Sequence, residues 1–387
     1  MQPRDGRTPI ARRLAAIVIG AGPAGLAVAA CLKQRGLEPV ILEKSNAVGA
    51  VWRRHYDRLQ LHTARSQSSL PGLPMPRAYG RYPSRAQVVA YLDSYAEKFD
   101  LKPVFNSAVL SVRRDGAQWR AESGEKSVSA PIVVVATGWA DYPYAPTWPG
   151  AEAFDGAIVH SSNYRNPEPY AGRRVLVVGF GNSGGEIALD LADAGVEVTV
   201  SVRGPVNILP RDLLGLPIMT FAIAQRRVPA RIADALNRPV IRLATGRIEK
   251  LGLIRASKGP RRMVEEEGRV PLLDNGTLAE IRRGRIKVRG GIARFTQKTV
   301  VFAQSPPQPF DAVILATGFR PDLRTLLPDA QGVLSTAGEP LVSGALTSER
   351  GLFFCGAIPS PTGQLREIGI EARRIADAVA AGSGLRA

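Results

Sequence analysis

The chain contains few residues of the kinds that carry thiol or metal chemistry. Its 387 residues include two cysteines, Cys31 and Cys355, and three histidines. The cysteines form no Cys-x-x-Cys pair and no metal-ligand spacing is present, so the sequence predicts neither a metal site nor a dithiol redox motif. Both cysteines fall in apolar runs, and we expect them to be buried small side chains. Such sparse use of cysteine suits a reducing compartment, and we predict a cytoplasmic location.

Long apolar runs and acidic residues are also scarce. No stretch reaches 18 apolar residues, so no membrane-spanning helix is expected. The 51 Lys and Arg exceed the 34 Asp and Glu, giving a formal net charge of +17. Such an excess favours nucleic-acid binding, but the chain lacks a basic tail, a helix-turn-helix pattern and interleaved aromatic and basic residues, so no nucleic-acid partner is expected. We interpret the arginines between residues 203 and 270 mostly as a solvated face, with weak adhesion to anionic lipid as an alternative: Arg226, Arg227, Arg231, Arg238, Arg242, Arg261 and Arg262.

Glycine, by contrast, recurs in a loop that follows an apolar run and precedes strong helix formers. The loop reads Gly20-Ala21-Gly22-Pro23-Ala24-Gly25. In such a Gly-x-Gly-x-x-Gly loop the first glycine permits a tight turn, the second lets a pyrophosphate approach, and the third allows close packing of helix on strand. Glu43 ends the next strand, about 20 positions further on, where an acid accepts hydrogen bonds from ribose hydroxyls. These features predict a dinucleotide site, the alternative being a glycine turn without a ligand.

A second loop repeats this layout with one change. It reads Gly179-Phe180-Gly181-Asn182-Ser183-Gly184, and Arg203 stands where an acid would follow the next strand. An arginine there offers charge-assisted hydrogen bonds to a 2′-phosphate, which favours NADPH over NADH. The alternative is a solvated surface arginine. Asn182 and Ser183 begin the helix, where they suit pyrophosphate oxygens or cap the helix.

Two dinucleotide loops in one chain predict an α/β fold with two Rossmann-like domains, one for FAD and one for NADPH. We expect the second domain to be inserted in the first. The predicted boundaries are 1–165 for the first part of the FAD domain, 166–290 for the NADPH domain and 291–387 for the return to the FAD domain. A helix is predicted from 84 to 99, with Ser84 as its N-cap, and a final helix from about 369 to 380.

Further motifs resemble the flavin-dependent monooxygenases that bind two dinucleotides, known as class B. The string Phe154–Tyr164 matches a fingerprint of flavin-containing and Baeyer–Villiger monooxygenases, and Leu315–Phe319 looks like an Ala-Thr-Gly-Tyr element of the same class. Within that class the chain is most similar to the YUCCA-type indole-3-pyruvate monooxygenases. Four stretches carry this closer likeness: Tyr56–His62, Tyr82–Arg85, Val206–Arg211 and Pro271–Leu278.

This resemblance implies that NADPH reduces FAD, that O₂ adds at the flavin C4a atom, and that the hydroperoxide so formed delivers one oxygen atom to a small molecule. In the YUCCA branch the substrate is a 2-oxo acid, which loses CO₂. Oxygenation of nitrogen or sulfur, and Baeyer–Villiger insertion, are alternatives within the class. An alternative from another class is an NADPH-dependent flavoprotein reductase that passes electrons to an acceptor protein.

The resemblance also assigns roles to particular residues. Trp52 lies in a Gly-x-x-Trp loop that faces the flavin in relatives, although a core tryptophan is the alternative. His62 stands where many relatives carry an asparagine beside the flavin, so it is expected to donate to the hydroperoxide or substrate, or else to be a hydrogen-bonded loop residue. His62 and Asn182 are the expected catalytic residues, and His160 is expected to act as a hinge or to position a cofactor. The remaining expected cofactor contacts are Ala316, Thr317, Gly318 and Gln364, while Ala357 replaces an acid common in relatives.

Overall fold

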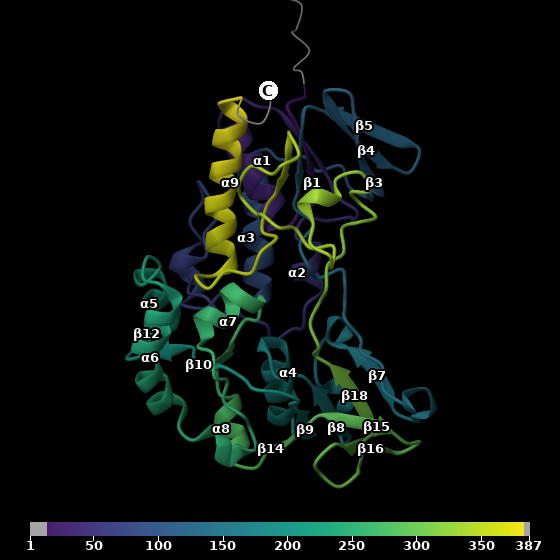
Figure 1. Ribbon diagram of the computed structural model, residues 1–387, viewed down its shortest axis with the longest axis vertical. Coiled ribbons are helices and arrows are strands. Elements are labelled where there is room, and N and C mark those ends of the chain that lie inside the picture. Colours follow the sequence, from purple (N-terminus) through teal and green to yellow (C-terminus); the bar gives the residue numbers. More distant parts are fainter. Residues whose placement is uncertain (1–13, 383–387) are drawn as a thin grey trace, which may run out of the picture.

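The computed structural model describes residues 14–382 and divides them between two parallel sheets, seen at the upper and lower ends of Figure 1. The predicted α/β fold with two Rossmann-like units is confirmed. Residues 1–13 and 383–387, which the predicted outer segments include, lie outside the described range. No helix within 14–382 is both long and apolar enough to cross a bilayer.

The first sheet forms around the strand that precedes the first glycine loop. Its strand order is β19-β6-β1-β2, all parallel. The strands are short and almost wholly apolar, as expected for a sheet covered on both faces: β1 (Ala16–Ile19), β2 (Pro39–Leu42), β6 (Ile132–Val135) and β19 (Leu352–Phe354). An antiparallel sheet of β3 (Ser111–Asp115), β4 (Gln118–Ser123) and β5 (Lys126–Ala130) adjoins it.

Helices pack on this sheet and supply most of its core. The helix α1 (Pro23–Lys33) packs along α9 (Gln364–Ala380), and α3 (Arg85–Lys98) lies beside α1. The predicted N-cap of α3 is confirmed, because the Ser84 hydroxyl accepts from the Gln87 backbone while the Gln87 side chain accepts from Ser84 N–H. The final helix begins at Gln364, five residues before the predicted start.

The second sheet has the order β14-β9-β8-β18-β7, again all parallel. Its strands are β7 (Ala157–His160), β8 (Arg174–Val178), β9 (Glu197–Ser201), β14 (Ile286–Arg289) and β18 (Ala312–Leu315). The helices α4 (Asn182–Asp193) and α8 (Thr277–Arg282) pack against it. A small antiparallel sheet follows β14: β15 (Ile292–Phe295), β16 (Thr299–Phe302) and β17 (Gln308–Pro309).

This pairing corrects the boundaries at 165 and 290. The strands β7 and β18 pair with each other and β18 pairs with β8, so the second unit extends from residue 157 to 315. The expected return to the first unit at residue 291 comes too early. The strands β6 and β18 are both apolar and both are followed by Ala-Thr-Gly. The motif alone therefore did not reveal which sheet the later strand joins.

Between β9 and β14 the chain builds a separate wall on one side of the molecule (Figure 1). The helices of this wall are α5 (Ile218–Ala224), α6 (Ala230–Thr245) and α7 (Pro260–Glu267). The short strands β10 (Ile208–Pro210) and β13 (Leu272–Asp274) pair in parallel, and β11 (Asp212–Leu213) forms a hairpin with β12 (Leu216–Pro217). A short helix of the first unit, α2 (Ala50–Arg54), completes the elements used below.

Candidate active site

The first glycine loop has the geometry that its sequence predicts. Gly20 has φ of +106°, a backbone conformation that side chains with a Cβ rarely adopt. A Cβ on Gly25 would overlap the Gly20 carbonyl oxygen, so close packing of α1 on β1 requires a glycine there. Gly22 is the N-cap of α1, with Pro23 and Ala24 in its first turn, and its backbone N–H groups point out of the helix.

The second loop reproduces this geometry at the start of α4. Gly179 also has φ of +106°, and a Cβ on Gly184 would overlap the Gly179 carbonyl oxygen. Gly181 is the N-cap of α4 and is exposed, and Asn182 and Ser183 are the first two residues of the helix. Two loops so alike form two equivalent phosphate cradles.

The space in front of each loop is open at the position where a side chain would begin. A Cβ built on Gly22 or on Gly181 meets no protein atom within 4 Å, so nothing in the fold itself demands glycine at either position. Both residues have ordinary extended backbone, with φ of −79° and −87°. The open backbone at these two positions leaves room for a group such as a pyrophosphate to lie against each loop.

Glu43 lies at the end of β2 with its carboxylate buried. One oxygen accepts from the Ala21 backbone N–H at 2.6 Å and the other accepts from Ser45 N–H at 2.8 Å. The carboxylate therefore braces the first loop and still has lone pairs for a ribose. Its predicted contact with the cofactor is a proposal that this position supports.

Arg203 lies just beyond β9, at the same sheet edge as the second loop. This follows from the register, because Val178 pairs with Ser201 and Gly179 N–H donates to the Ser201 carbonyl. The Arg203 side chain is exposed and makes no hydrogen bond or ion pair within residues 14–382. A free guanidinium beside a phosphate cradle is available for a 2′-phosphate.

A cavity of about 950 Å³ runs from the first loop into the side wall. It reaches nine of the predicted site residues: Gly20, Gly22, Pro23, Ala24, Glu43, Trp52, His62, Asn182 and Gln364. The other predicted residues lie outside it: Gly25 behind the first loop, and Gly179, Gly181, Ser183, Gly184, Arg203, Ala316, Thr317 and Gly318 around the second. The structure thus separates the two predicted dinucleotide sites, and Asn182 lies where they meet.

His62 faces this cavity with one ring nitrogen fixed. Its Nε2 lies 2.9 Å from Oε1 of Glu186, a residue of α4 that is only 3 % exposed. The Tyr56 hydroxyl donates to the other oxygen of Glu186 at 2.6 Å, and the Asn275 amide donates to Oε1 at 3.2 Å. Burial, with the nearby Glu186 charge, raises the pKa of Tyr56 well above its ordinary value, so this phenol remains a donor. The His62 Nδ1 makes no hydrogen bond with a described residue, which leaves it for a ligand.

Asn182 is fixed in a similar way. Its Oδ1 accepts from the Leu273 backbone N–H at 2.8 Å, which ties the start of α4 to the side wall. Beyond this point the cavity becomes an apolar chamber. We call it the chamber below; its lining includes Leu209, Ile218, Met219, Phe221, Ile241, Val264 and Leu273.

Trp52 and Gln364 flank the other part of the cavity. Trp52 lies in α2 and packs between the cores of both units. The Gln364 side chain donates to the carbonyls of Gly356 and Ile358, so it shapes the loop before α9. Glu371, which the sequence did not single out, accepts from Gly356 N–H at 2.6 Å, and burial raises its pKa. This acid braces the loop from below, where Ala357 replaces the acid of relatives.

The element Ala316-Thr317-Gly318 closes the second loop from behind. His160 Nδ1 accepts from Ser162 N–H at 3.1 Å, so the neutral ring donates through Nε2 to the Gly318 carbonyl at 3.1 Å. Burial lowers the pKa of His160, which favours this neutral form. The Thr317 hydroxyl donates to the Tyr144 carbonyl. These contacts match a positioning role for His160 better than proton transfer.

Both cysteines are free and buried, as the sequence predicts. Burial raises the pKa of Cys31 and of Cys355, so both thiols stay protonated. Within residues 14–382 no cluster of three or more His, Cys, Asp and Glu side chains is arranged to hold a metal ion.

Sequence reasoning missed Glu186, its partners Tyr56 and Asn275, and the chamber. Glu186 looks like an ordinary polar position of an amphipathic helix, and its bonding partners are 89 to 130 residues away in the chain. The only available signal was that Tyr56 and Asn275 fall inside two of the stretches that resemble the YUCCA branch.

Comparisons with known proteins agree with these features. Residues 11–328 match the family model of flavin-binding monooxygenase-like proteins. The chain is 40% identical over 328 residues to indole-3-pyruvate monooxygenase YUCCA1 of Oryza sativa subsp. japonica, covering 84% of this chain and 81% of that protein. It is 39% identical over 337 residues to YUCCA6 of Arabidopsis thaliana, covering 84% and 80%.

Among solved structures, a flavin-containing monooxygenase from Stenotrophomonas maltophilia superposes with a TM-score of 0.74 at 26% identity, covering 96% of this chain and 99% of that one. The predicted flavin is thereby confirmed, and the expected pair of FAD and NADPH suits the two cradles. The chain belongs to the flavin-binding monooxygenase-like family and is a flavin-dependent monooxygenase that acts on a small molecule.

Proposed function

We propose that the chain is an FAD- and NADPH-dependent monooxygenase that oxidatively decarboxylates a 2-oxo acid of the indole-3-pyruvate kind. The observation that carries this proposal is the continuity of the cavity. It begins at the first phosphate cradle, passes His62 and Asn182, and ends in the chamber. If the aromatic group of such a substrate occupies the chamber, its 2-oxo acid group lies toward the flavin side of the cavity.

The stretches that resemble the YUCCA branch support the substrate class. Three of the four contribute residues to the cavity lining, among them His62, Leu209 and Leu273. The fourth contains Tyr82, whose hydroxyl donates to Asp212 of the hairpin beside the chamber. Relatives that are 39 and 40% identical to this chain bear the name indole-3-pyruvate monooxygenase.

When bound and reduced by NADPH, the flavin supplies the oxygen activation. The chain's own residues then have positioning tasks. Glu186 fixes the His62 ring through Nε2 and leaves Nδ1 for a ligand, and the apolar chamber walls exclude water from the substrate. In the overall reaction a C–O bond forms at the 2-oxo carbon, the bond to the carboxylate breaks, and the second oxygen atom leaves as water: 2-oxo acid, O₂, NADPH and H⁺ give the shortened acid, CO₂, NADP⁺ and water.

The competing functions differ in what they require from the chain. A flavoprotein reductase passes electrons to an acceptor protein; where that acceptor is a disulfide, the reductase needs an accessible thiolate, whereas both thiols here are buried and protonated. Oxygenation of an amine, a sulfide or a ketone uses the same flavin chemistry and differs only in the substrate. The buried, unpaired thiols also support the cytoplasmic location that we propose.

Product analysis under ¹⁸O₂ tests the proposal. Purified protein with FAD and NADPH is given indole-3-pyruvate, phenylpyruvate, an amine or a cyclic ketone in turn. We expect indole-3-acetate carrying one ¹⁸O atom, with one CO₂ released and one NADPH oxidised for each turnover. If NADPH oxidation yields only hydrogen peroxide with both oxo acids, or if the amine or ketone is oxygenated instead, the substrate assignment is wrong.

A further inference from the structure

The outer wall of the chamber is a helix with two very different sides. The inner side of α6 carries Ala233, Asp234, Asn237 and Ile241, all of which line the cavity. The opposite side faces solvent, and its residues are large and apolar. This helix belongs to the arginine-rich segment whose role neither the flavin chemistry nor the substrate pocket explains.

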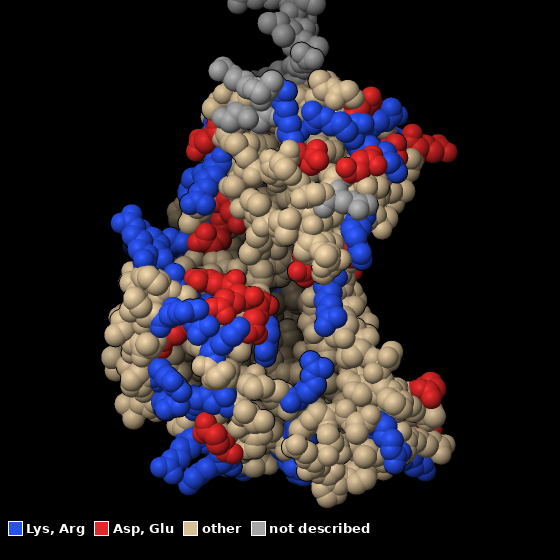
Figure 2. All heavy atoms as spheres, viewed as in Figure 1, with Lys and Arg blue, Asp and Glu red and all other residues tan. Residues whose placement is uncertain are grey.

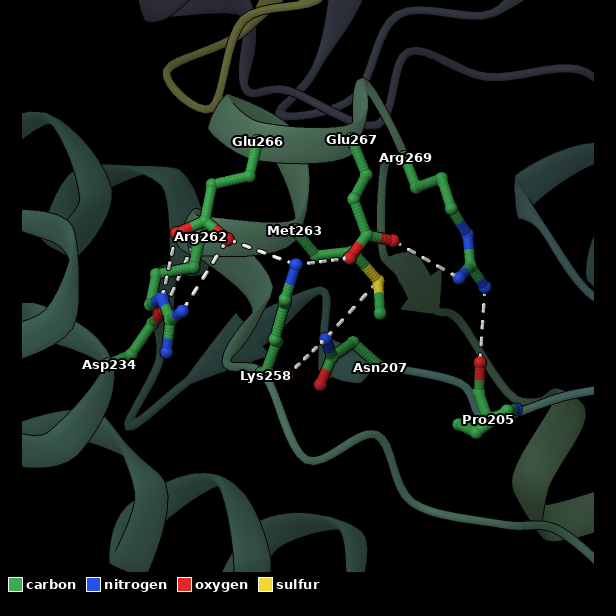
Figure 3. Close-up of polar contacts among 9 residues, drawn as sticks. All are labelled: Pro205, Asn207, Asp234, Lys258, Arg262, Met263, Glu266, Glu267 and Arg269. Atoms are coloured by element: carbon green, nitrogen blue, oxygen red, sulfur yellow. Dashed lines mark hydrogen bonds and ion pairs between the residues drawn. The ribbon is translucent and has the colours of Figure 1, made fainter.

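The orientation of α6 is fixed by its inner side. The Asp234 carboxylate accepts from the backbone N–H of Arg261 and of Arg262, each at 3.0 Å, and so caps the N-terminus of α7 (Figure 3). Asn237 exchanges hydrogen bonds with the Gln225 amide at the end of α5. With these contacts in place, α6 cannot rotate its apolar side inward.

The solvent-facing side of α6 is an unusually exposed apolar stripe. Ile232, Leu236 and Leu243 are 53, 64 and 86 % exposed, and their spacing of four and seven residues puts them on one side of the helix. Leu214, at the tip of the β11–β12 hairpin, lines the same cavity as Val240 of α6; it is 89 % exposed and has φ of +51°, a conformation unfavourable for leucine. We call these four leucine and isoleucine side chains the apolar face.

Unpaired arginines border this face. The side chains of Arg226, Arg227, Arg231, Arg238 and Arg242 form no hydrogen bond or ion pair in the described part of the chain. The basic residues around α7 behave differently. Figure 3 shows Lys258 between Glu266 and Glu267, Arg262 on Glu266 and Arg269 on Glu267. The positive charge of this segment is therefore neutralised at α7 and left free around α6.

We infer that the apolar face docks on an anionic lipid surface. An apolar stripe flanked by cations on an amphipathic helix is the arrangement that buries its apolar side chains in the interface while its arginines meet lipid phosphates. Figure 2 shows uncharged atoms over α5 and α6 with Lys and Arg above and below them, and a group of acids toward α7. A second copy of the chain suits this face less well, because pairing it with itself would bring like-charged arginines together.

The cavity reaches this face. Leu214 and Val240 both line the cavity and are exposed to solvent, at 89 and 43 %. A molecule that partitions into the lipid interface would therefore meet the chamber without crossing bulk water. Docking itself does not depend on the proposed substrate, because three of the four side chains of the apolar face, Ile232, Leu236 and Leu243, lie outside the cavity.

Vesicle sedimentation tests the docking. The flavin-loaded protein is mixed with vesicles of phosphatidylcholine alone or with 30 mol% phosphatidylglycerol, a composition chosen as about that of a strongly anionic leaflet. We expect the protein to pellet with the anionic vesicles and to be released by about 0.5 M salt, which screens such attraction. Arg238→Gln with Arg242→Gln should lower the partition coefficient about 25-fold, since each basic residue at an anionic surface contributes about 1 kcal/mol.

Removing the apolar side chains gives the second variant. Leu236→Ser with Leu243→Ser should abolish pelleting while leaving the flavin content, the melting temperature and the turnover of dissolved substrate unchanged, because neither leucine lines the cavity. The matched control is Leu341→Ser with Leu346→Ser, at positions 56 and 52 % exposed in the other unit, which should pellet like the unaltered protein. Absence of binding to anionic vesicles, or equal binding by both leucine pairs, overturns the inference. So does a dimer in solution that Leu236→Ser with Leu243→Ser dissociates.

Discussion

Replacing Gly22 by valine separates binding of the flavin from folding. The Gly22 backbone is extended, and a Cβ there meets no protein atom within 4 Å. The substitution removes no contact, but valine caps a helix less well than glycine, so the free energy of unfolding of the flavin-free protein should fall by about 0.5 to 1 kcal/mol. The added side chain instead fills the space in which a pyrophosphate would lie against the loop. We expect the purified variant to be colourless.

Gly25→Ala is the matched control in the same loop. Its Cβ would lie within the radius of the Gly20 carbonyl oxygen, which belongs to the backbone and cannot turn aside as a flexible side chain could. Overpacking of this kind costs about 1 to 3 kcal/mol, so this smaller substitution should destabilise even the flavin-free protein. The larger side chain at position 22 is thus predicted to be the milder change for the fold.

Two measurements check this reversal. The ratio of flavin to protein absorbance gives the occupancy, and urea denaturation after removal of the flavin gives the free energy of unfolding. Retention of flavin at normal occupancy by Gly22→Val would refute the assignment of the first loop as the cradle. Equal destabilisation by both variants would show that Gly22 serves the fold, contrary to the open space in front of it.

The other predictions concern the second cradle, the polar contacts of His62, and pH. Gly181→Val should keep its flavin yet resist reduction by NADPH while dithionite still reduces it, and reduction by NADPH at the normal rate would count against the second site. Arg203→Ala should raise the KM for NADPH by about 10- to 100-fold, the value of a charge-assisted contact of about 1.5 to 3 kcal/mol, and leave the KM for NADH unchanged; equal loss with both would remove the 2′-phosphate contact. Glu186→Gln keeps the shape of the side chain but offers one acceptor oxygen where the carboxylate has two, so the orientation of His62 is lost. We expect kcat to fall at least 10-fold with the flavin content unchanged. An unaltered kcat would contradict a positioning role for Glu186. Burial, and to a smaller extent the nearby arginines, lower the pKa of His55 from 6.5 to about 4. Between these two pH values the unfolded chain binds a proton at His55 and the folded chain does not. The free energy of unfolding should therefore fall by up to about 1.4 kcal/mol per pH unit as the pH drops from 6.5 to 4. Denaturation of His55→Gln should show a flatter slope over that range, and an identical slope would mean that another group titrates.

Local patterns predicted the parts of the site that depend on backbone geometry. The turn at Gly20, the close approach at Gly25 and the cradle at Gly22 follow from the absence of a Cβ, and each is a property of a few consecutive residues. The same reasoning located the second loop and the cap of α3. In each of these cases the backbone conformation or cap and the residues that make it possible lie within a few consecutive positions of the sequence.

The parts that sequence reasoning missed depend on contacts between distant segments. His62 and Glu186 are 124 residues apart, and the pattern around Glu186 predicts only a helix. The side wall shows the same limit, because the side of α6 that faces the cavity is set by Asp234 meeting the N-terminus of α7. The boundary at residue 291 failed because β6 and β18 are both apolar strands followed by Ala-Thr-Gly.

One helix, α4, joins these distant parts into a single site. Its first residue holds the side wall through Leu273, its next turn presents Glu186 to Tyr56 and His62, and its last turn places Asp193 at 2.6 Å from the Arg58 guanidinium. The segment 56–62 of the first unit is thereby bonded to a helix of the second. Hydrogen bonds to charged groups contribute about 1.5 to 3 kcal/mol each, so a rotation between the units that separated this segment from α4 would lose several kcal/mol. If the two units rotate apart, the segment 56–62, including His62, must therefore move together with α4, and the chain must bend at other connections between the units.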